Sequence, residues 1–125
     1  MKNTHHLHGK KILIVEDDAL NSSLLEEILS EEKPTLYFTP NGSDAVLMAL
    51  EKKPDLILMD IGLPDMSGYE SVREILLHLP KARIIALTAF SSQTDREKAL
   101  AVGCIEHVGK PINSQQLLSL INKYL

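Results

Sequence analysis

Short runs of apolar residues alternate with segments of helical periodicity along most of this chain. Three of the runs, at 12–15, 56–59 and 84–87, contain no polar residue, which is typical of strands covered on both faces. Five strands are predicted, at residues 11–15, 35–39, 55–60, 83–88 and 104–108, and the more polar segment 35–39 suits a sheet edge. Strands that alternate with helices indicate an α/β fold with a parallel sheet.

The intervening segments carry start and stop signals of helices. The first helix is predicted to begin after Asp18, whose side chain is a good N-cap. The apolar stripe of this helix is predicted to contain Leu20, Leu24, Leu25 and Ile28. The other predicted helix caps are Asn41, Ser67, Thr94 and Asn113.

Length and composition fit one globular domain: the chain has 125 residues, 44% hydrophobic and 24% charged. A formal charge of −4 without a basic block argues against direct nucleic-acid binding, and no apolar stretch is long enough to span a membrane. The single cysteine, Cys104, suits a reducing compartment, so a cytoplasmic location is expected. Residues 1–10 lack periodicity and are expected to form a mobile leader before a domain at 11–125.

Polar side chains stand where the apolar runs end. Asp17, Asp60, Thr88 and Lys110 each fall at or just after the carboxyl end of a predicted strand. Ligands of open α/β sheets bind outside this edge. Carboxylate oxygens with room for water suit Mg²⁺, and a cation there would neutralise the oxygens of a phosphoryl group. The candidate ligands are Asp17, Asp60 and the backbone carbonyl of Gly62, with Glu16 acting through a water.

The candidate roles differ with the chemistry of each side chain. Asp60 is the expected nucleophile and forms an aspartyl phosphate, Thr88 donates a hydrogen bond, and Lys110 supplies a positive charge. Taken alone, Asp60 is a turn or cap residue, Thr88 a strand-end hydroxyl and Lys110 a solvated lysine. Their joint placement at one edge favours the functional interpretation.

Four motifs at these strand ends together resemble those of the receiver domain of two-component response regulators. They are Val-Glu-Asp-Asp at 15–18, Leu-Met-Asp-Ile-Gly-Leu-Pro-Asp-Met-Ser-Gly at 58–68, Ala-Leu-Thr-Ala at 86–89 and Gly-Lys-Pro at 109–111. Each motif alone is weak, but the four in this order are specific, and the resemblance covers residues 11–125. It implies a flavodoxin-like (βα)₅ fold with strand order 2-1-3-4-5.

The resemblance also implies roles for individual residues. Glu16 and Asp17 match the acidic pair that holds Mg²⁺, and Asp60 matches the phosphoacceptor. Thr88 and Lys110 match the switch hydroxyl and the lysine that contacts the phosphoryl group, and the Lys110–Pro111 bond is expected to be cis. The phosphoryl donor would be a phosphohistidine on a histidine kinase or a histidine phosphotransfer protein.

The sequence differs from the family pattern in two respects. His107 stands where the family often has Tyr or Phe, so a weaker or pH-dependent rotamer switch is expected there. Gly62 and Phe90 stand at the entrance to the phosphoryl group, where Gly62 leaves room for water and Phe90 could screen it. The family implies that a downstream partner binds the face of helix 4, strand 5 and helix 5. Its exposed residues are expected to include Gln93, Arg96, Lys98, Glu106, Gln115 and Lys123.

Specific residues argue against two other functions. A small aspartyl-phosphate phosphatase would usually carry an acid two residues after the nucleophile, where this chain has Gly62, so no turnover of external substrates is expected. A flavin site would need a phosphate-binding loop after the first strand, where the acids at 16–18 stand instead. An adaptor that is never phosphorylated stays open, as do a stand-alone regulator and a receiver from a hybrid kinase.

Overall fold

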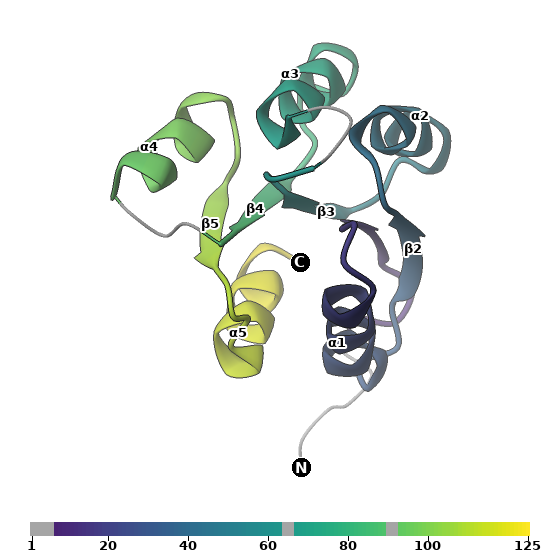
Figure 1. The fold of residues 1–125 in the computed structure, drawn as a ribbon. Helices are drawn as coiled ribbons and strands as arrows, with labels where there is room; N and C mark the ends of the chain where they lie inside the picture. The colour runs from purple at the N-terminus through teal and green to yellow at the C-terminus, as the bar shows by residue number, and fades with distance from the viewer. Residues whose placement is uncertain (1–6, 64–66, 90–92) are drawn as a thin grey trace.

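The structure, a computed structural model, describes residues 7–63, 67–89 and 93–125. Strands and helices alternate through these ranges (Figure 1). The strands are β1 (Lys11–Val15), β2 (Thr35–Thr39), β3 (Leu56–Asp60), β4 (Ile84–Thr88) and β5 (Glu106–Gly109). The helices are α1 (Ala19–Ser30), α2 (Gly42–Lys52), α3 (Gly68–His78), α4 (Gln93–Ala101) and α5 (Ser114–Tyr124). None of the helices in these ranges has the length and apolar character needed to cross a membrane.

The five strands form one parallel sheet in the order β2-β1-β3-β4-β5, which confirms the predicted topology and the place of β2 at an edge. The register aligns the carboxyl ends of the inner strands: Val15 lies beside Met59, and Asp60 lies beside Leu87. The residues that follow these positions are therefore brought to one edge of the sheet.

Alternation of side chains along the strands divides the core into two layers. One layer packs against α1 and α5, and the other against α2, α3 and α4, as the ribbon shows (Figure 1). Along β1, Ile12 and Ile14 enter the first layer, while Leu13 and Val15 enter the second. Apolar side chains thus cover both faces of the sheet, and polar groups collect at its ends.

Four of the predicted helix caps are confirmed. Asp18 accepts hydrogen bonds from the backbone N–H groups of Leu20 (2.8 Å) and Asn21 (3.3 Å). The caps of α2, α3 and α5 are Asn41, Ser67 and Asn113. The fifth prediction is wrong, because Thr94 is the second residue of α4 and so lies inside the helix.

The predicted apolar stripe of α1 is wrong at its first two positions. The side chain of Leu20 is 81% exposed and that of Leu24 is 38% exposed, whereas Leu25 and Leu29 are fully buried. Five apolar residues in this helix allow more than one stripe at helical spacing. The rotation of α1 against β1 and α5 selects the stripe that contains Leu25 and Leu29.

The described part of the expected leader, residues 7–10, packs against the domain. Leu7 is fully buried in the layer beside α1 and α5. Its backbone N–H donates to the carbonyl of Glu32 (3.0 Å), and its carbonyl accepts from Lys10 (2.9 Å). Leu7 therefore adds apolar contacts that the lack of periodicity conceals, while the mobility of the leader stays a prediction. Residues 1–6 lie outside the described ranges.

Candidate functional site

The polar residues predicted from the strand ends lie around one cleft at the carboxyl edge of the sheet. Glu16 and Asp17 follow β1, Asp60 and Thr88 are the last residues of β3 and β4, and Lys110 follows β5. The cleft has a volume of about 380 Å³. Its lining consists of Glu16, Asp17, Asp18, Asn21, Asp60, Ile61, Gly62, Thr88, Ala89 and Lys110.

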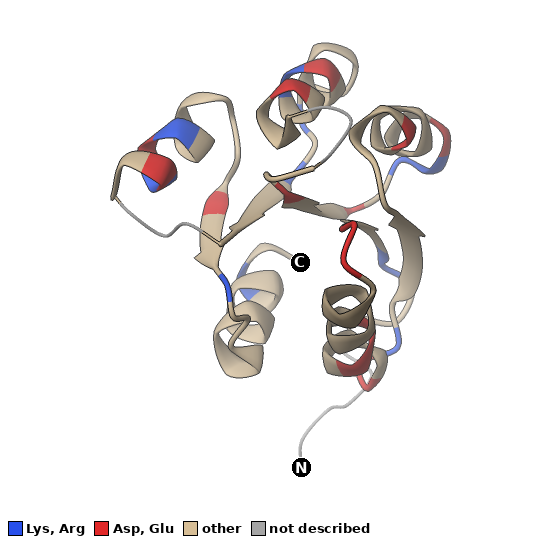
Figure 2. Cartoon of the chain, in the orientation of Figure 1, with Lys and Arg blue, Asp and Glu red and all other residues tan. Residues whose placement is uncertain are grey.

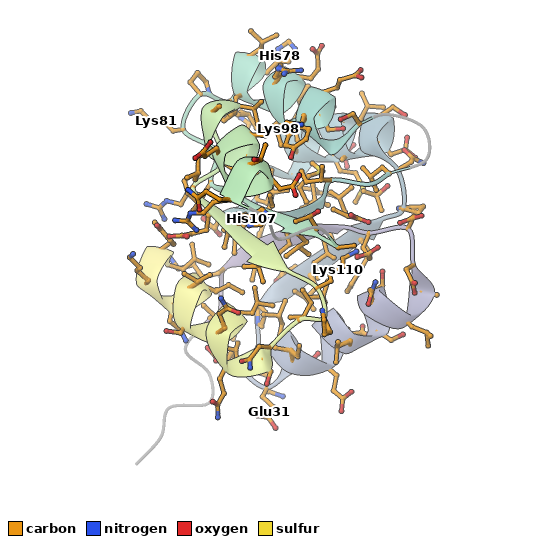
Figure 3. The ribbon with its side chains drawn as sticks, turned by 60° about the vertical axis from the view of Figure 1, so that its left-hand side comes forward. Glu31, His78, Lys81, Lys98, His107 and Lys110 are labelled. Atoms are coloured by element: carbon orange, nitrogen blue, oxygen red, sulfur yellow. The ribbon has the colours of Figure 1, made fainter. Side chains whose placement is uncertain are left out.

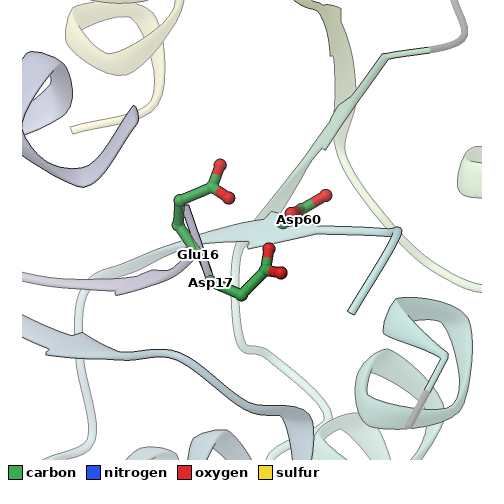
Figure 4. A group of neighbouring side chains, drawn as sticks. All are labelled: Glu16, Asp17 and Asp60. Carbon is green, nitrogen blue, oxygen red and sulfur yellow. The ribbon is translucent and has the colours of Figure 1, made fainter. Parts of the chain in front are cut away.

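Three carboxylates converge in this cleft (Figure 4). One oxygen each from Glu16, Asp17 and Asp60 can be chosen so that all three lie within 4.8 Å of one another. Glu16 and Asp60 are buried, with 4% and 5% exposure, while Asp17 is exposed at the mouth. Oxygen ligands from carboxylates, open to water on one side, are the donor set that Mg²⁺ prefers, so these residues fit a magnesium ion.

Lys110 contacts two of these acids. Its ammonium Nζ lies 2.8 Å from Glu16 Oε1 and 3.4 Å from Asp60 Oδ2. The backbone N–H of Lys110 donates to the carbonyl of Thr88 (2.8 Å), which fixes the turn after β5 against the end of β4. The structure thus shows a contact of Lys110 that the sequence did not predict: its shorter ion pair neutralises Glu16.

The pKa values of this ion pair show the cost of burying charge. Burial is the largest cause that raises the pKa of Glu16 above 4.5, and Asp60 raises it further, while Lys110 and the N–H of Asp18 lower it. Burial lowers the pKa of Lys110, but the hydrogen bond to Glu16 and the charges of Asp60 and Glu16 raise it above 10.5 overall. Lys110 therefore stays charged at neutral pH, and its stabilising contribution is lost only as pH rises beyond 10.5. Glu16 has the opposite effect: above pH 4.5 its ionised form lowers the free energy of unfolding.

A single ammonium does not balance three carboxylates. At 4.8 Å, two like charges repel by about 3 kcal/mol at an effective dielectric constant of about 20. Lys110 compensates Glu16 and Asp60 in part, and water screens the exposed Asp17. A divalent cation between the acids would remove the remaining repulsion.

Backbone amides orient the two buried acids. The N–H of Gly62 donates to Asp60 Oδ1 (3.0 Å), and the N–H of Asp18 donates to Glu16 Oε2 (3.1 Å). Asp60 Oδ2 is left facing Lys110. Gly62 lines the cleft, and the contact of its carbonyl with a metal stays a prediction.

The start of α3 packs directly beneath Asp60, which the sequence did not reveal. A Cβ atom on Gly68 would lie 2.6 Å from the carbonyl oxygen of Asp60 and 2.5 Å from the Cα of Ile61. The N–H of Gly68 donates to the carbonyl of Ile61 (3.0 Å). Gly68 therefore fixes the position of the strand end that carries the candidate nucleophile.

Asn21 is a second residue of the cleft that the sequence interpretation missed. It lies in the first turn of α1, and its side chain belongs to the lining. One feature of the sequence could have identified it: Asn21 stands three residues after the cap Asp18, at the end of the helix that points toward this edge.

His107 lies in β5, and its register partner is Ala86 of the layer formed by α2, α3 and α4. Its Nε2 atom is buried and has no hydrogen-bond partner among the described residues.

The Lys110–Pro111 peptide bond is cis, as expected. Phe90, expected at the entrance, lies outside the described residues.

The predicted partner face is exposed at most of its positions. Of the residues predicted to be exposed on α4, β5 and α5, one differs: Glu106 is partly buried. Glu106 Oε2 accepts a hydrogen bond from Tyr124 Oη (2.8 Å) and lies 4.0 Å from Lys123 Nζ. The structure therefore gives Glu106 a bracing contact between β5 and α5.

Comparison with known proteins assigns the family. The sequence model of the response regulator receiver domain matches residues 12–122. This chain belongs to the response regulator receiver domain family. The polar-differentiation response regulator DivK of Brucella anthropi is 37% identical over 121 residues, which covers 93% of this chain and 96% of DivK. This receiver domain and DivK therefore match over nearly their whole lengths.

Solved structures agree with this assignment. The receiver domain of a sensor histidine kinase from Pseudomonas aeruginosa, with a magnesium ion coordinated in its active site cleft, is 34% identical, with a TM-score of 0.85. That match covers 93% of this chain and 97% of the other. A second match comes from a co-crystal structure of the Saccharomyces cerevisiae histidine phosphotransfer protein Ypd1 with the receiver domain of Ssk1. It has a TM-score of 0.88 and 32% identity, and covers 94% of this receiver and 90% of that chain.

Proposed function

We propose that this receiver accepts a phosphoryl group on Asp60 from a phosphohistidine and thereby changes its protein partners. The observation that carries the proposal is the environment of Asp60. Asp60 is 5% exposed as a residue, and its carboxylate lies 3.4 Å from Lys110 Nζ in a cleft with two further acids. No general base is needed, because an ionised carboxylate is already a nucleophile.

In the proposed reaction, an oxygen of Asp60 forms a bond to phosphorus while the bond between phosphorus and the donor imidazole nitrogen breaks. The electron pair of that bond leaves with the imidazole. Lys110 and Thr88 would bind phosphoryl oxygens, and the N–H of Gly62 already holds Asp60 Oδ1 in place. Glu16, Asp17, Asp60 and the Gly62 carbonyl would hold Mg²⁺, which, when bound, supplies charge neutralisation for the transferring group.

The donor is proposed to be a histidine kinase or a histidine phosphotransfer protein in the cytoplasm. Support for this class comes from the co-crystal of Ypd1 with the receiver domain of Ssk1, a structural relative. Only self-directed phosphoryl transfer and autodephosphorylation are proposed.

The switch is proposed to act through contacts that Thr88 makes with the phosphoryl group in only one of two states. His107 would turn inward in that state. Its Nε2 atom is buried and has no hydrogen-bond partner in the described part of the chain, so no hydrogen bond at this atom holds the ring in its present position. A downstream partner would then bind the face of α4, β5 and α5. Unchanged phosphorylation-dependent partner binding in His107→Ala would exclude this role for His107.

Incubation with acetyl phosphate and Mg²⁺ tests the proposed phosphoacceptor. Intact-protein mass spectrometry should show one phosphoryl group per chain, and Asp60→Asn should abolish it. Asp44→Asn, which changes an exposed acid of α2 outside the cleft, should keep full incorporation. Phosphate release faster than the decay of the phosphorylated protein after acetyl phosphate is removed would instead indicate a phosphatase, and no incorporation would indicate an adaptor.

Magnesium should also stabilise the folded protein. At a Mg²⁺ concentration of one hundred times Kd, the free energy of unfolding should rise by about 2.7 kcal/mol, because the ion binds only the folded site. Urea unfolding with MgCl₂ and with NaCl of equal ionic strength measures this effect. Asp17→Asn removes an exposed ligand and should lose most of the increase. An equal increase in NaCl would show screening of charge rather than binding.

A further inference from the structure

A second cavity, of about 400 Å³, lies outside the phosphorylation site. Four apolar residues, Pro54, Leu79, Pro80 and Ala82, form part of its lining. The others are basic: Lys53, His78 and Lys81. We call these seven residues the basic groove.

The basic groove lies at the edge of the sheet opposite to Asp60. Its residues come from the segments that precede β3 and β4, and in a parallel sheet the starts of the strands share one edge. Figure 3 shows Lys81 on the side where β5 begins, while Lys110 lies at the carboxyl end of β5. A partner in the basic groove would therefore leave the phosphorylation cleft free.

The charge of the basic groove is opposite to that of the whole chain. The protein carries a formal charge of −4, yet the lining contains two lysines, one histidine and no acid. On α3 and α4, by contrast, acids and bases are interspersed (Figure 2). The basic groove thus presents a local surface that attracts acidic groups.

Nearby acids are engaged elsewhere. Glu51 Oε1 lies 3.2 Å from Lys52 Nζ, and Asp55 Oδ2 accepts a hydrogen bond from the N–H of Lys11 (2.8 Å). Within the described ranges, neither Lys53 nor Lys81 forms an ion pair with a carboxylate. Both lysines are exposed and accessible to a partner.

The floor of the basic groove is apolar and locally rigid. Pro54 and Pro80 have fixed φ angles and no backbone N–H, so they offer hydrophobic surface without donors. Lys53 is held at φ 47° as the C-cap of α2, where its N–H donates to the carbonyl of Ala49 (2.9 Å). A preformed surface of this kind loses little conformational entropy when it binds.

We propose that the basic groove binds an acidic segment of a partner protein. An apolar side chain of that segment would contact Pro54, Leu79 and Pro80, and flanking carboxylates would pair with Lys53 and Lys81. Charge complementarity selects this occupant, because an apolar surface with a rim of lysines disfavours neutral or basic segments.

Two peptides test this proposal by NMR on the full-length, ¹⁵N-labelled protein. One is acetyl-Glu-Asp-Leu-Phe-Asp-Glu-amide, and the other replaces every acid by its amide. The acidic peptide should shift backbone amides at 53, 55, 78, 79, 81 and 82, and the amide peptide should bind at least tenfold more weakly. The double variant Lys53→Glu/Lys81→Glu should also bind the acidic peptide at least tenfold more weakly, because two attractions become repulsions.

Lys33→Glu is the matched control. Lys33 is also exposed, also has a positive φ (59°) and also precedes a proline, but it lies outside the basic groove. It should leave peptide binding unchanged, and all variants should keep phosphorylation at Asp60. Absence of shifts at the groove amides with millimolar peptide would overturn the proposal. Equal binding of the amide peptide, or by the double variant, would also overturn it.

Discussion

Gly68→Ala is expected to lower the free energy of unfolding by about 3 kcal/mol, the upper part of the usual range for overpacking. The added Cβ would lie 2.5 Å from the Cα of Ile61 and 2.6 Å from the carbonyl oxygen of Asp60. Both are backbone atoms, so no rotation of a flexible side chain relieves the overlap. Either the start of α3 or the end of β3 must move, and urea unfolding measures the cost.

The same substitution should slow the proposed phosphorylation, because Ile61 directly follows Asp60, the candidate nucleophile. Gly62→Ala is the matched control within this segment. Its Cβ would meet only Asp60 Oδ1, at an ordinary distance of 3.9 Å, so a change within about 0.5 kcal/mol is expected. Equal stability of the two variants would show that α3 does not constrain the position of Asp60.

Leu7→Ala is also expected to destabilise the protein, by about 3 kcal/mol. Leu7 is fully buried against the layer of α1 and α5, so truncation removes apolar contacts and leaves a cavity. The hydrogen bond from its N–H to the carbonyl of Glu32 holds the backbone beside the site of truncation and limits collapse. Thermal or urea unfolding measures the change.

His8→Ala provides the comparison, because His8 is the next residue and is exposed. It should alter the free energy of unfolding by less than about 0.5 kcal/mol. If Leu7→Ala were as stable as His8→Ala, the segment at 7–10 would not be packed in solution. The first expectation of a mobile leader would then be correct for these residues.

The sheet and the edge that carries the site were predictable because the sequence patterns that indicate them involve residues only a few positions apart. Runs such as 56–59 are typical of a strand covered on both faces, so the apolar pattern predicts β3. A parallel sheet then places Asp17, Asp60, Thr88 and Lys110 at one edge. Caps such as Asp18 were also predictable, since a cap contacts residues only two or three positions away.

The rotation of α1 was not predictable in the same way. Helical spacing shows that its leucines form a stripe, but several stripes are possible, and contacts with β1 and α5 select the one that contains Leu25 and Leu29. Thr94 had the spacing of a cap, yet α4 begins one residue earlier, at Gln93.

The sequence by itself determined that strands alternate with helices and that acids stand at the strand ends. The resemblance to a known family added the strand order and the match of Asp60 to a phosphoacceptor. Only the tertiary structure decided that Lys110 lies closer to Glu16 than to Asp60, that Gly68 packs beneath the end of β3, and that Leu7 belongs to the core. The reason is how far apart in the sequence the interacting residues lie. Strand periodicity and caps depend on residues a few positions apart, whereas these contacts depend on the packing of segments that are distant in the chain.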